Sequence, residues 1–572
     1  MNDEKLIQAP PKREPVARAG WSTRLNKSKT ADYAIVILAL LPAMVMYYNR
    51  FSPEAAVYFT YFKNFFAKPF SFQPGVVEFG AASPLHVLVY APIHALFGDH
   101  WILASKLLNF LLVGFGVVAL NRAIKGGTKS VLLTSLLVVL STGMLLSVSQ
   151  LFETGLAFFA MALLYHDLTE KNFERALLLC GSLYLIRAEL FVVGVAVAFY
   201  IMIQSEKSKA LLPWLAAGCA PALIYHGYML AATGTLVPTG VMTTLIGYVQ
   251  EPASWLSRTS DTWAALWGAE GLIYMCGAVL MLVMVAEWSV PRYGKEMLLL
   301  APLLIVYTLM PPGPAVIRYL VPILPALIAL LVRYIEKELK VQHSYRALLV
   351  SLALAHLFGA ATLSGSINPD RNTVLLSDLS NSINRLAGPE DHVLLYDIQG
   401  QYGMAAPCHA LSGNVGDDMV DVLLRRESVS EFIHKNNIRF VITSDALGTR
   451  PLYANTLLSE LNSKDPQVAP GDTIHLGGLA FEKQFSNSAF MRRAGRTEPV
   501  QASAFPTMDE IEPRPLWNSV YKVLEPGSGA TAAIGEAVSL HDQTGGVPVA
   551  AGSIPDSLAP APPAPIAVNP GP

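Results

Sequence analysis

A series of apolar segments, many nearly long enough to cross a bilayer, limits what this chain can fold into. A helix needs ~20 residues to span the hydrocarbon core. Hydrophobic residues make up 52% and charged residues 15% of the 572-residue chain, as in integral membrane proteins. The sequence therefore predicts a polytopic α-helical membrane protein with about eleven spans. The expected spans are residues 32–49, 101–120, 130–149, 151–166, 177–188, 190–203, 211–231, 271–289, 297–311, 318–334 and 346–363.

A further apolar segment, residues 84–97, is short and contains Pro92, so it is interpreted as a re-entrant or interfacial helix. If it does not cross, all the Lys/Arg-rich loops fall on the side of the basic N-terminal tail. The positive-inside rule then places the N-terminus and these loops in the cytoplasm and the C-terminal part outside. The loops concerned are residues 121–129, 166–175, 204–209, 291–296 and 333–346.

Composition divides the chain into four parts. Residues 1–30 form a basic cytoplasmic tail, and residues 31–364 form a transmembrane domain with an outer loop at 50–100. Short β-type runs at residues 392–398 and 438–445, separated by helical patterns, indicate a small α/β domain. Two further boundaries follow: the outer α/β domain covers residues 365–525, and a disordered Ala/Pro/Gly-rich tail covers 526–572.

The stretch from Arg50 to Leu85 alternates aromatic rings with charges. Such mixtures suit the headgroup layer, where a ring body lies in hydrocarbon and its polar edge in water. Two interpretations remain open, a plain interfacial loop and an active-site loop that lies on the membrane.

Charged residues beside the outer ends of the predicted spans are the candidates for chemistry. Charges at membrane depth are costly unless paired or wet, so Glu153, Arg187, Glu189 and Arg318 are expected to line one polar cavity. A simple ion pair between Arg187 and Glu189 is the alternative. Arginine suits phosphate because it makes bidentate contacts. Glu54, just beyond the first span, is the candidate base for an acceptor hydroxyl.

Other classes of site find little support. The sequence has no basic stripe for nucleic acid, no P-loop and no zinc-protease motif. Its four cysteines lack metal-site spacing, and so do the histidines at 86, 94 and 100.

The order of these segments resembles the GT-C type of integral-membrane glycosyltransferase, in particular bacterial arabinofuranosyltransferase- and mannosyltransferase-like proteins. In that family an outer loop begins with an aspartate pair and continues through Tyr-Ala-Lys/Arg-Asn, Asn-Pro-Gly, Glu-Gly and Ser-Pro-Leu-Trp. Later segments read Gly-Leu-Glu, Arg-Pro-Glu and Arg-Tyr-Leu-x-Pro-x-x-Pro. The matching segments here are Tyr61 to Asn64, Gln73 to Gly75, Glu78 to Gly80, Ser83 to His86, Glu153 to Leu156, Arg187 to Glu189, Gly234 to Thr239, Arg318 to Pro325 and Val393 to Tyr402.

Three departures from the family pattern stand out. The aspartate pair aligns with Pro53-Glu54, which leaves one carboxylate. The segment Arg187-Ala188-Glu189 lacks the proline of Arg-Pro-Glu. A family segment that ends in Pro-Asn-Thr matches Gly234 to Thr239, but no asparagine precedes Thr239 here. A glutamate accepts a proton by the same chemistry as an aspartate, with a longer reach.

The resemblance implies an inverting glycosyltransferase in the bacterial inner membrane. It would move a sugar from a polyprenyl-phosphate donor to an envelope glycan or glycolipid on the outer face. Glu54 would be the catalytic base. No cofactor or metal site is expected, because a divalent cation needs several oxygen ligands and one carboxylate remains here. The implied substrate-binding residues are Lys63, Asn64, Glu78, His86, Glu153, Arg187, Glu189, Arg318 and Tyr319.

Two alternatives remain. The chain is either a catalytically inactive relative that binds lipid-linked glycan or scaffolds envelope assembly, or a transporter or flippase. The transporter predicts inverted repeats, which the sequence does not show.

Overall fold

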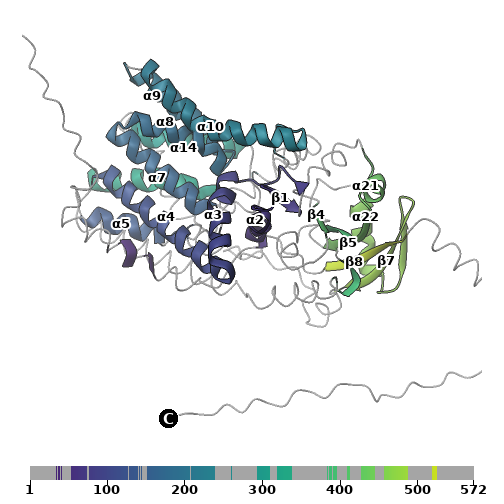
Figure 1. Ribbon diagram of the computed structural model, residues 1–572. Helices are drawn as coiled ribbons and strands as arrows, with labels where there is room; N and C mark the ends of the chain where they lie inside the picture. The colour runs from purple at the N-terminus through teal and green to yellow at the C-terminus, as the bar shows by residue number, and fades with distance from the viewer. Residues whose placement is uncertain are drawn as a thin grey trace, which may run out of the picture. The chain divides into compact units, whose positions relative to one another are not determined.

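The structure is a computed structural model (Figure 1). Short gaps apart, it describes residues 53–139, 151–238, 293–309, 319–337, 391–395, 409–412, 427–444, 457–486 and 518–524, with a few single positions between them. This part of the chain is mostly helical and includes a small sheet, as the sequence predicts. The described helices before residue 338 are α2 (Pro53–Asn64), α3 (Pro84–Phe97), η2 (Gly98–His100), α4 (Trp101–Ile124), α5 (Thr128–Val139), α7 (Thr154–Glu170), α8 (Phe173–Ile186), α9 (Leu190–Gln204), α10 (Ser208–Thr233), α14 (Gly294–Leu309), η5 (Val321–Ile323) and α16 (Leu324–Lys337).

The helices form a bundle, and their termini lie at its two ends. Short turns reverse the chain between α7 and α8 and again between α8 and α9. We call one end the Glu153 end, where α7 begins, and the other the Glu296 end, where α7 finishes and α14 starts. Seventeen residues make α7 about 25 Å long, close to the thickness of bilayer hydrocarbon.

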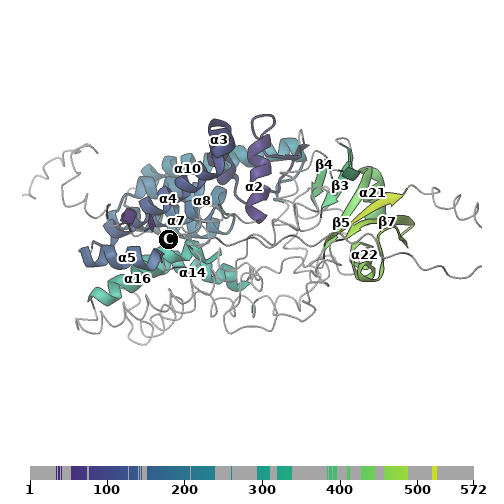
Figure 2. The same ribbon diagram turned by 90° about the horizontal axis from the view of Figure 1, so that it is seen from below.

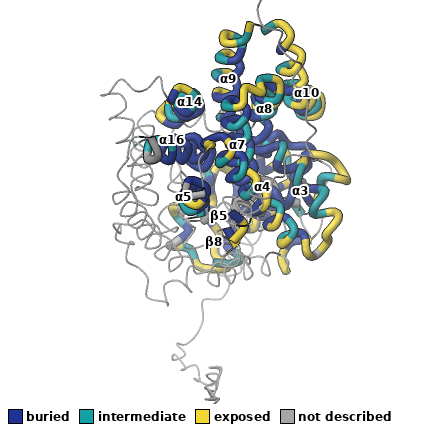
Figure 3. Tube along the Cα trace, turned by 90° about the vertical axis from the view of Figure 1, so that its left-hand side faces the viewer, coloured by how far each residue is buried: buried dark blue, intermediate teal, exposed yellow. Residues whose placement is uncertain are grey.

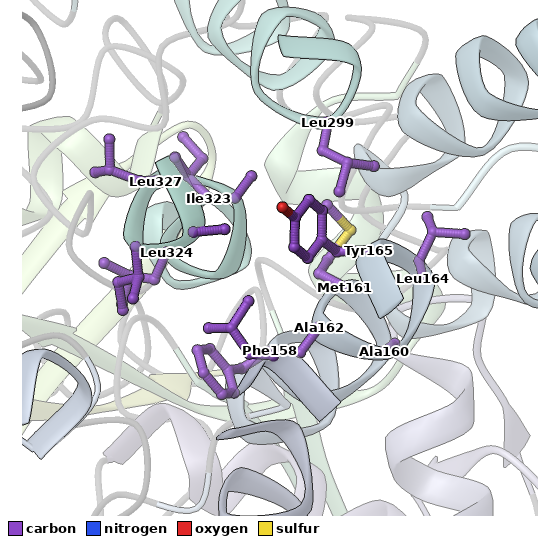
Figure 4. Close-up of a cluster of buried hydrophobic side chains, with 14 of the residues drawn as sticks. Phe158, Ala160, Met161, Ala162, Leu164, Tyr165, Leu299, Ile323, Leu324 and Leu327 are labelled. Carbon is purple, nitrogen blue, oxygen red and sulfur yellow. The ribbon is translucent and has the colours of Figure 1, made fainter. Parts of the chain in front are cut away.

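The core of the bundle is formed by α7 against α14 and α16. Figure 4 shows Phe158, Met161 and Ala162 of α7 facing Ile323, Leu324 and Leu327, with Leu299 of α14 beside Tyr165. These side chains are all buried, and their van der Waals contacts hold the three elements together.

Glycines let the helices approach closely. A Cβ atom on Gly155 of α7 would lie 1.8 Å from Asn109 Oδ1 of α4, and one on Gly181 of α8 would lie 2.2 Å from the Gly218 carbonyl carbon of α10. Small residues at such contacts are typical of packed membrane helices.

The prediction of eleven spans is not confirmed. Within the described ranges, α4 and α10 are the two helices long and apolar enough to cross a membrane. Shorter helices occupy several other predicted spans: α8 has 14 residues where 177–188 was expected, and α9 has 15 where 190–203 was expected. The chain reverses at polar turns before these helices reach bilayer length. The predicted spans 271–289 and 346–363, and most of 32–49, lie outside the described residues.

Several helices expose apolar stripes. On α9, Phe191, Val195, Phe199 and Ile203 recur every four residues and are all at least half exposed. Figure 3 shows exposed residues along α9 and α10. A further stripe runs along α4 and consists of Leu103, Leu107, Leu111 and Phe115.

The aromatic stretch folds into a compact unit that packs against Leu185 of α8 and Tyr225 of α10. Strands β1 (Ser71–Gln73) and β2 (Val76–Val77) follow α2, and α3 begins at Ser83-Pro84, with proline in its first turn. Most of its rings are buried against one another, and Phe66 is an exposed exception. The unit therefore has a packed core, whereas the sequence suggested rings spread through the headgroup layer. The expected helix at 84–97 is α3, with the same bounds.

The C-terminal sheet has six strands in the order β4-β3-β5-β8-β7-β6 (Figure 2). Strand β3 pairs in parallel with β4 and β5, while β5–β8 and β6–β7 are antiparallel. The bounds are β3 (His392–Leu395), β4 (His409–Ser412), β5 (Ile438–Ser444), β6 (Thr473–Leu476), β7 (Leu479–Ser486) and β8 (Asn518–Leu524), with helices α21 (Val429–Lys435), α22 (Leu457–Lys464) and η8 (Asp465–Gln467).

Local signals account for much of this unit. A capping box joins Ser428 and Glu431 at the start of α21. The β6–β7 hairpin turns at Gly477-Gly478, both with positive φ, as a two-residue hairpin loop favours. Strands β3 and β5 lie within the expected runs at 392–398 and 438–445, so the small α/β unit is present. The predicted domain boundaries remain predictions.

Candidate functional site

A buried ion-pair cluster lies at the Glu153 end of the bundle. Arg187 Nη1 donates to Glu153 Oε1 at 2.7 Å, and Arg187 Nε donates to Glu189 Oε1 at 2.5 Å. The guanidinium carbon lies 4.2 Å from the centroid of the Tyr319 ring. The side chains of Arg187 and Glu153 are each 5% exposed. We call these four residues the Arg187 cluster.

Each charged member sits where a helix begins or ends. Glu153 precedes α7 and Glu189 precedes α9, so both carboxylates lie at helix N-termini, where the helix dipole favours negative charge. Arg187 follows α8 in an extended conformation, with φ −158°. The polar turns that end the short helices therefore supply the charges of the site.

Two tyrosines from other helices join the cluster. Tyr58 of α2 lies beside the Glu153 carboxyl group, to which its hydroxyl can donate. The Tyr307 ring of α14 lies edge to face with the Tyr319 ring, with 6.2 Å between the ring centroids. The site therefore joins α2, α14 and the starts or ends of α7, α8 and α9.

Among the described residues, the cluster has more carboxylates than cations, and it has one vacant acceptor. Two carboxylates contact one guanidinium. Glu153 Oε2 is buried and has no hydrogen-bond partner among the described residues. A buried acceptor without a partner costs about 1–3 kcal/mol, so the site favours a ligand with a hydroxyl or another donor. Arg187 has carboxylate partners where the sequence suggested a phosphate.

The candidate base lies on the helix that reaches this cluster. Glu54 is in the first turn of α2, one helical turn before Tyr58; its side chain is outside the described set. Arg318 also lies outside the described residues, directly before Tyr319.

His86 of α3 lies next to this site. Its ring is 4.9 Å from the ring of Tyr58, edge to face, and 4.2 Å from that of Tyr90. Burial lowers the pKa of His86 to about 3, so the ring is neutral at physiological pH. His86 thus contacts Tyr58 as a neutral ring and helps to position it.

The remaining predicted residues have other surroundings. Asn64 Nδ2 donates to the Phe72 carbonyl at 2.8 Å and ties α2 to β1. Lys63 is exposed and interacts with His94. Glu78 is buried, and its backbone N–H bonds to the Phe70 carbonyl. The contacts of Asn64 and Lys63 given above are with residues outside the Arg187 cluster.

Sequence reasoning missed Tyr58 and Tyr307 as members of the site. Tyr58 belongs to a run of aromatic residues in which nothing distinguishes it, and its position one turn after Glu54 was the available signal. Tyr307 lies in an apolar helix and carried no signal. Over the described residues, no group of three or more His, Cys, Asp and Glu side chains is placed to hold a metal ion.

Comparison with known proteins finds no matching family model and no matching curated sequence.

Proposed function

We propose that this chain is an integral-membrane glycosyltransferase of the GT-C kind. It takes a sugar from a polyprenyl-phosphate donor and attaches it to a hydroxyl group of an envelope glycan or lipid. Its polypeptide crosses the bacterial inner membrane about eleven times, with the Glu153 end at the outer face and the C-terminal α/β unit outside.

The observation that carries the proposal is the Arg187 cluster with its vacant Glu153 oxygen. Its four residues belong to motif segments that resemble the family, and they meet in one buried site. A hydroxyl donor on a sugar or acceptor satisfies Glu153 Oε2.

Membrane placement is supported by the exposed apolar stripes of α4 and α9. In water these stripes would be unfavourable, whereas acyl chains cover them without cost. The two ends of α7 are about 25 Å apart, so the Glu153 end and the Glu296 end both fit near the surfaces of a bilayer.

The proposed reaction is a single displacement. Glu54 takes the proton from the acceptor hydroxyl, whose oxygen forms a bond to the anomeric carbon of the donor. The bond between that carbon and the phosphate oxygen breaks, and the polyprenyl phosphate leaves with the electron pair. Arg187 orients Glu153 and Glu189, and these hold hydroxyl groups of the substrates.

One observation favours a second function. Arg187 already has two carboxylate partners and an aromatic ring, as a purely structural arginine would. Together with Pro53-Glu54 in place of an aspartate pair, this supports an inactive relative that binds lipid-linked glycan.

Mass profiles of envelope glycans and glycolipids separate the two functions. The strains are a deletion and complements with wild type, Glu54→Gln, Glu153→Gln and, as a control, Glu170→Gln at the other end of α7. The transferase predicts that the deletion lacks one sugar unit, which wild type and Glu170→Gln restore and a well-expressed Glu54→Gln does not. Restoration by both Glu54→Gln and Glu153→Gln would rule out the proposed chemistry.

A further inference from the structure

Three lysines gather at the Glu296 end of the bundle. Helices α4 and α7 terminate at Lys125 and Lys171, and Lys295 lies in the first turn of α14. Lys125 Nζ lies 3.1 Å from Glu170 Oε1, so the ends of α4 and α7 are adjacent. We call Lys125, Lys171 and Lys295 the lysine triad.

Among the described residues, the paired carboxylates beside the lysine triad are fewer than the cations there. Burial lowers the pKa of Lys295, Glu296 opposes this, and the charges of Arg333, Lys171 and Lys125 lower it further. Each of these cations therefore repels Lys295, and the Tyr165–Glu296 hydrogen bond holds the start of α14 against the last part of α7. Glu170 pairs with Lys125 and Glu296 with Arg333, whereas Lys171 and Lys295 have no salt bridge in the described part of the chain.

Backbone geometry shows that the lysines occupy unfavourable positions. Lys125 and Lys171 both have φ 57°, in the left-handed region that glycine and asparagine adopt more easily. Gly126 and Asn172 follow them directly in the sequence. A residue that adopts positive φ more easily than lysine is therefore one position away in each case.

The helix dipole accounts for only part of this arrangement. It favours cations at the C-termini of α4 and α7, but it disfavours a cation at the N-terminus of α14, where Lys295 lies. An anion held between the three ammonium groups would relieve the repulsion at all of them.

We propose that the lysine triad binds the phosphate group of an anionic membrane lipid. Ammonium groups are compact point charges that suit phosphate oxygens. Helix α4 exposes Leu111 and Phe115, and Phe115 is about 15 Å along the helix from Lys125, so acyl chains have an apolar surface to lie against. The proposal rests on the membrane placement given above and not on glycosyl transfer.

Native mass spectrometry of the purified full-length chain tests this. The protein is titrated with phosphatidylglycerol or phosphatidylcholine, and the affinity for each is measured for wild type and for Lys171→Gln/Lys295→Gln. The control is Lys209→Gln/Lys435→Gln, which removes two lysine charges elsewhere. A third variant, Lys171→Arg/Lys295→Arg, keeps the charges.

Wild type is expected to prefer phosphatidylglycerol. The glutamine variant should lose about fivefold per lysine, or roughly 25-fold in phosphatidylglycerol affinity, with unchanged affinity for phosphatidylcholine. The control and the arginine variant should behave like wild type. If the double glutamine variant does not fold, the single variants Lys171→Gln and Lys295→Gln decide the matter, with an expected loss of about fivefold each.

Two results would overturn the proposal. The first is a glutamine variant that keeps the preference of wild type. The second is displacement of the lipid by excess inorganic phosphate as effective as displacement by phosphatidylglycerol itself, which would assign the site to a soluble phosphate. Because the readout is lipid affinity, a loss of sugar transfer in the strains above leaves this test unaffected.

Discussion

The two ends of the bundle bury similar groups in different ways. At the Glu153 end, Arg187 pairs with two carboxylates and stacks on Tyr319. At the Glu296 end, Arg333 pairs with Glu296 alone, which also accepts a hydrogen bond from Tyr165 at 2.5 Å. We call Tyr165, Glu296 and Arg333 the Glu296 clamp.

The difference lies in where the side chains originate. Tyr165 and Arg333 lie within α7 and α16, and Glu296 lies in the first turn of α14, so the clamp is suited to fixing three helices together. The charged residues of the Arg187 cluster lie in turns. Among the described residues, its carboxylates outnumber its cations by one. Glu153 Oε2 and Glu296 Oε2 are both buried without a described hydrogen-bond partner. The excess of carboxylates over cations is therefore the feature that separates the Arg187 cluster from the Glu296 clamp and favours binding.

The largest expected effect separates chemistry from stability. Glu54→Gln should reduce sugar transfer by about 10²- to 10⁴-fold, the range for loss of a general base, and leave the unfolding temperature unchanged. The measurement is transfer to acceptor in membranes that contain equal amounts of protein. Glu54→Asp serves as control because it keeps the carboxylate and should retain part of the activity. Full activity in Glu54→Gln would show that Glu54 is not the base.

The next effect concerns the Glu296 clamp. Arg333→Ala leaves Glu296 buried without its cation and should lower the free energy of unfolding by about 3–5 kcal/mol. Denaturant unfolding in detergent micelles measures this. The double variant Arg333→Leu/Glu296→Leu removes both charges and should recover most of the loss. A double variant as unstable as the single one would show that the pair is not the source of the effect.

Glu153→Gln sharpens the comparison. It keeps the shape of the side chain, and Arg187 keeps Glu189, so we expect less than about 1 kcal/mol loss of stability. Transfer should fall about 10- to 100-fold because the oxygens at the site lose their charge, and hydrogen bonds to charged groups are the stronger ones. An unfolding temperature that falls in step with activity would assign Glu153 to structure.

The smallest expected effects come from removing one tyrosine hydroxyl at each end of the bundle. Tyr165→Phe should cost about 1.5 kcal/mol of stability, since its hydroxyl donates to a buried carboxylate, and should not change transfer per folded protein. Tyr58→Phe should lower transfer several-fold with a smaller change in stability. The same unfolding and transfer assays apply to both, and a reversed pattern would exchange the roles assigned to the two ends.

The sequence by itself determined the local elements. Apolar runs, prolines and turn residues placed α3 at residues 84–97 and strands β3 and β5 within their expected runs. Local periodicity and capping fix such elements. Motif resemblance also selected Glu153, Arg187, Glu189 and Tyr319, which the structure brings together. Their proposed function remains a prediction.

Only the tertiary structure decided which atoms meet. Tyr165 and Glu296 are 131 positions apart in the chain, and no local pattern signals their contact. The partners of Arg187, the recruitment of Tyr58 and Tyr307 and the grouping of the lysine triad likewise depend on how helix faces pack. Packing is set by side-chain shape over many residues, whereas hydropathy gives only length and mean polarity. Hydropathy alone predicted about eleven spans, whereas two helices in the described part of the chain are long and apolar enough to cross a membrane.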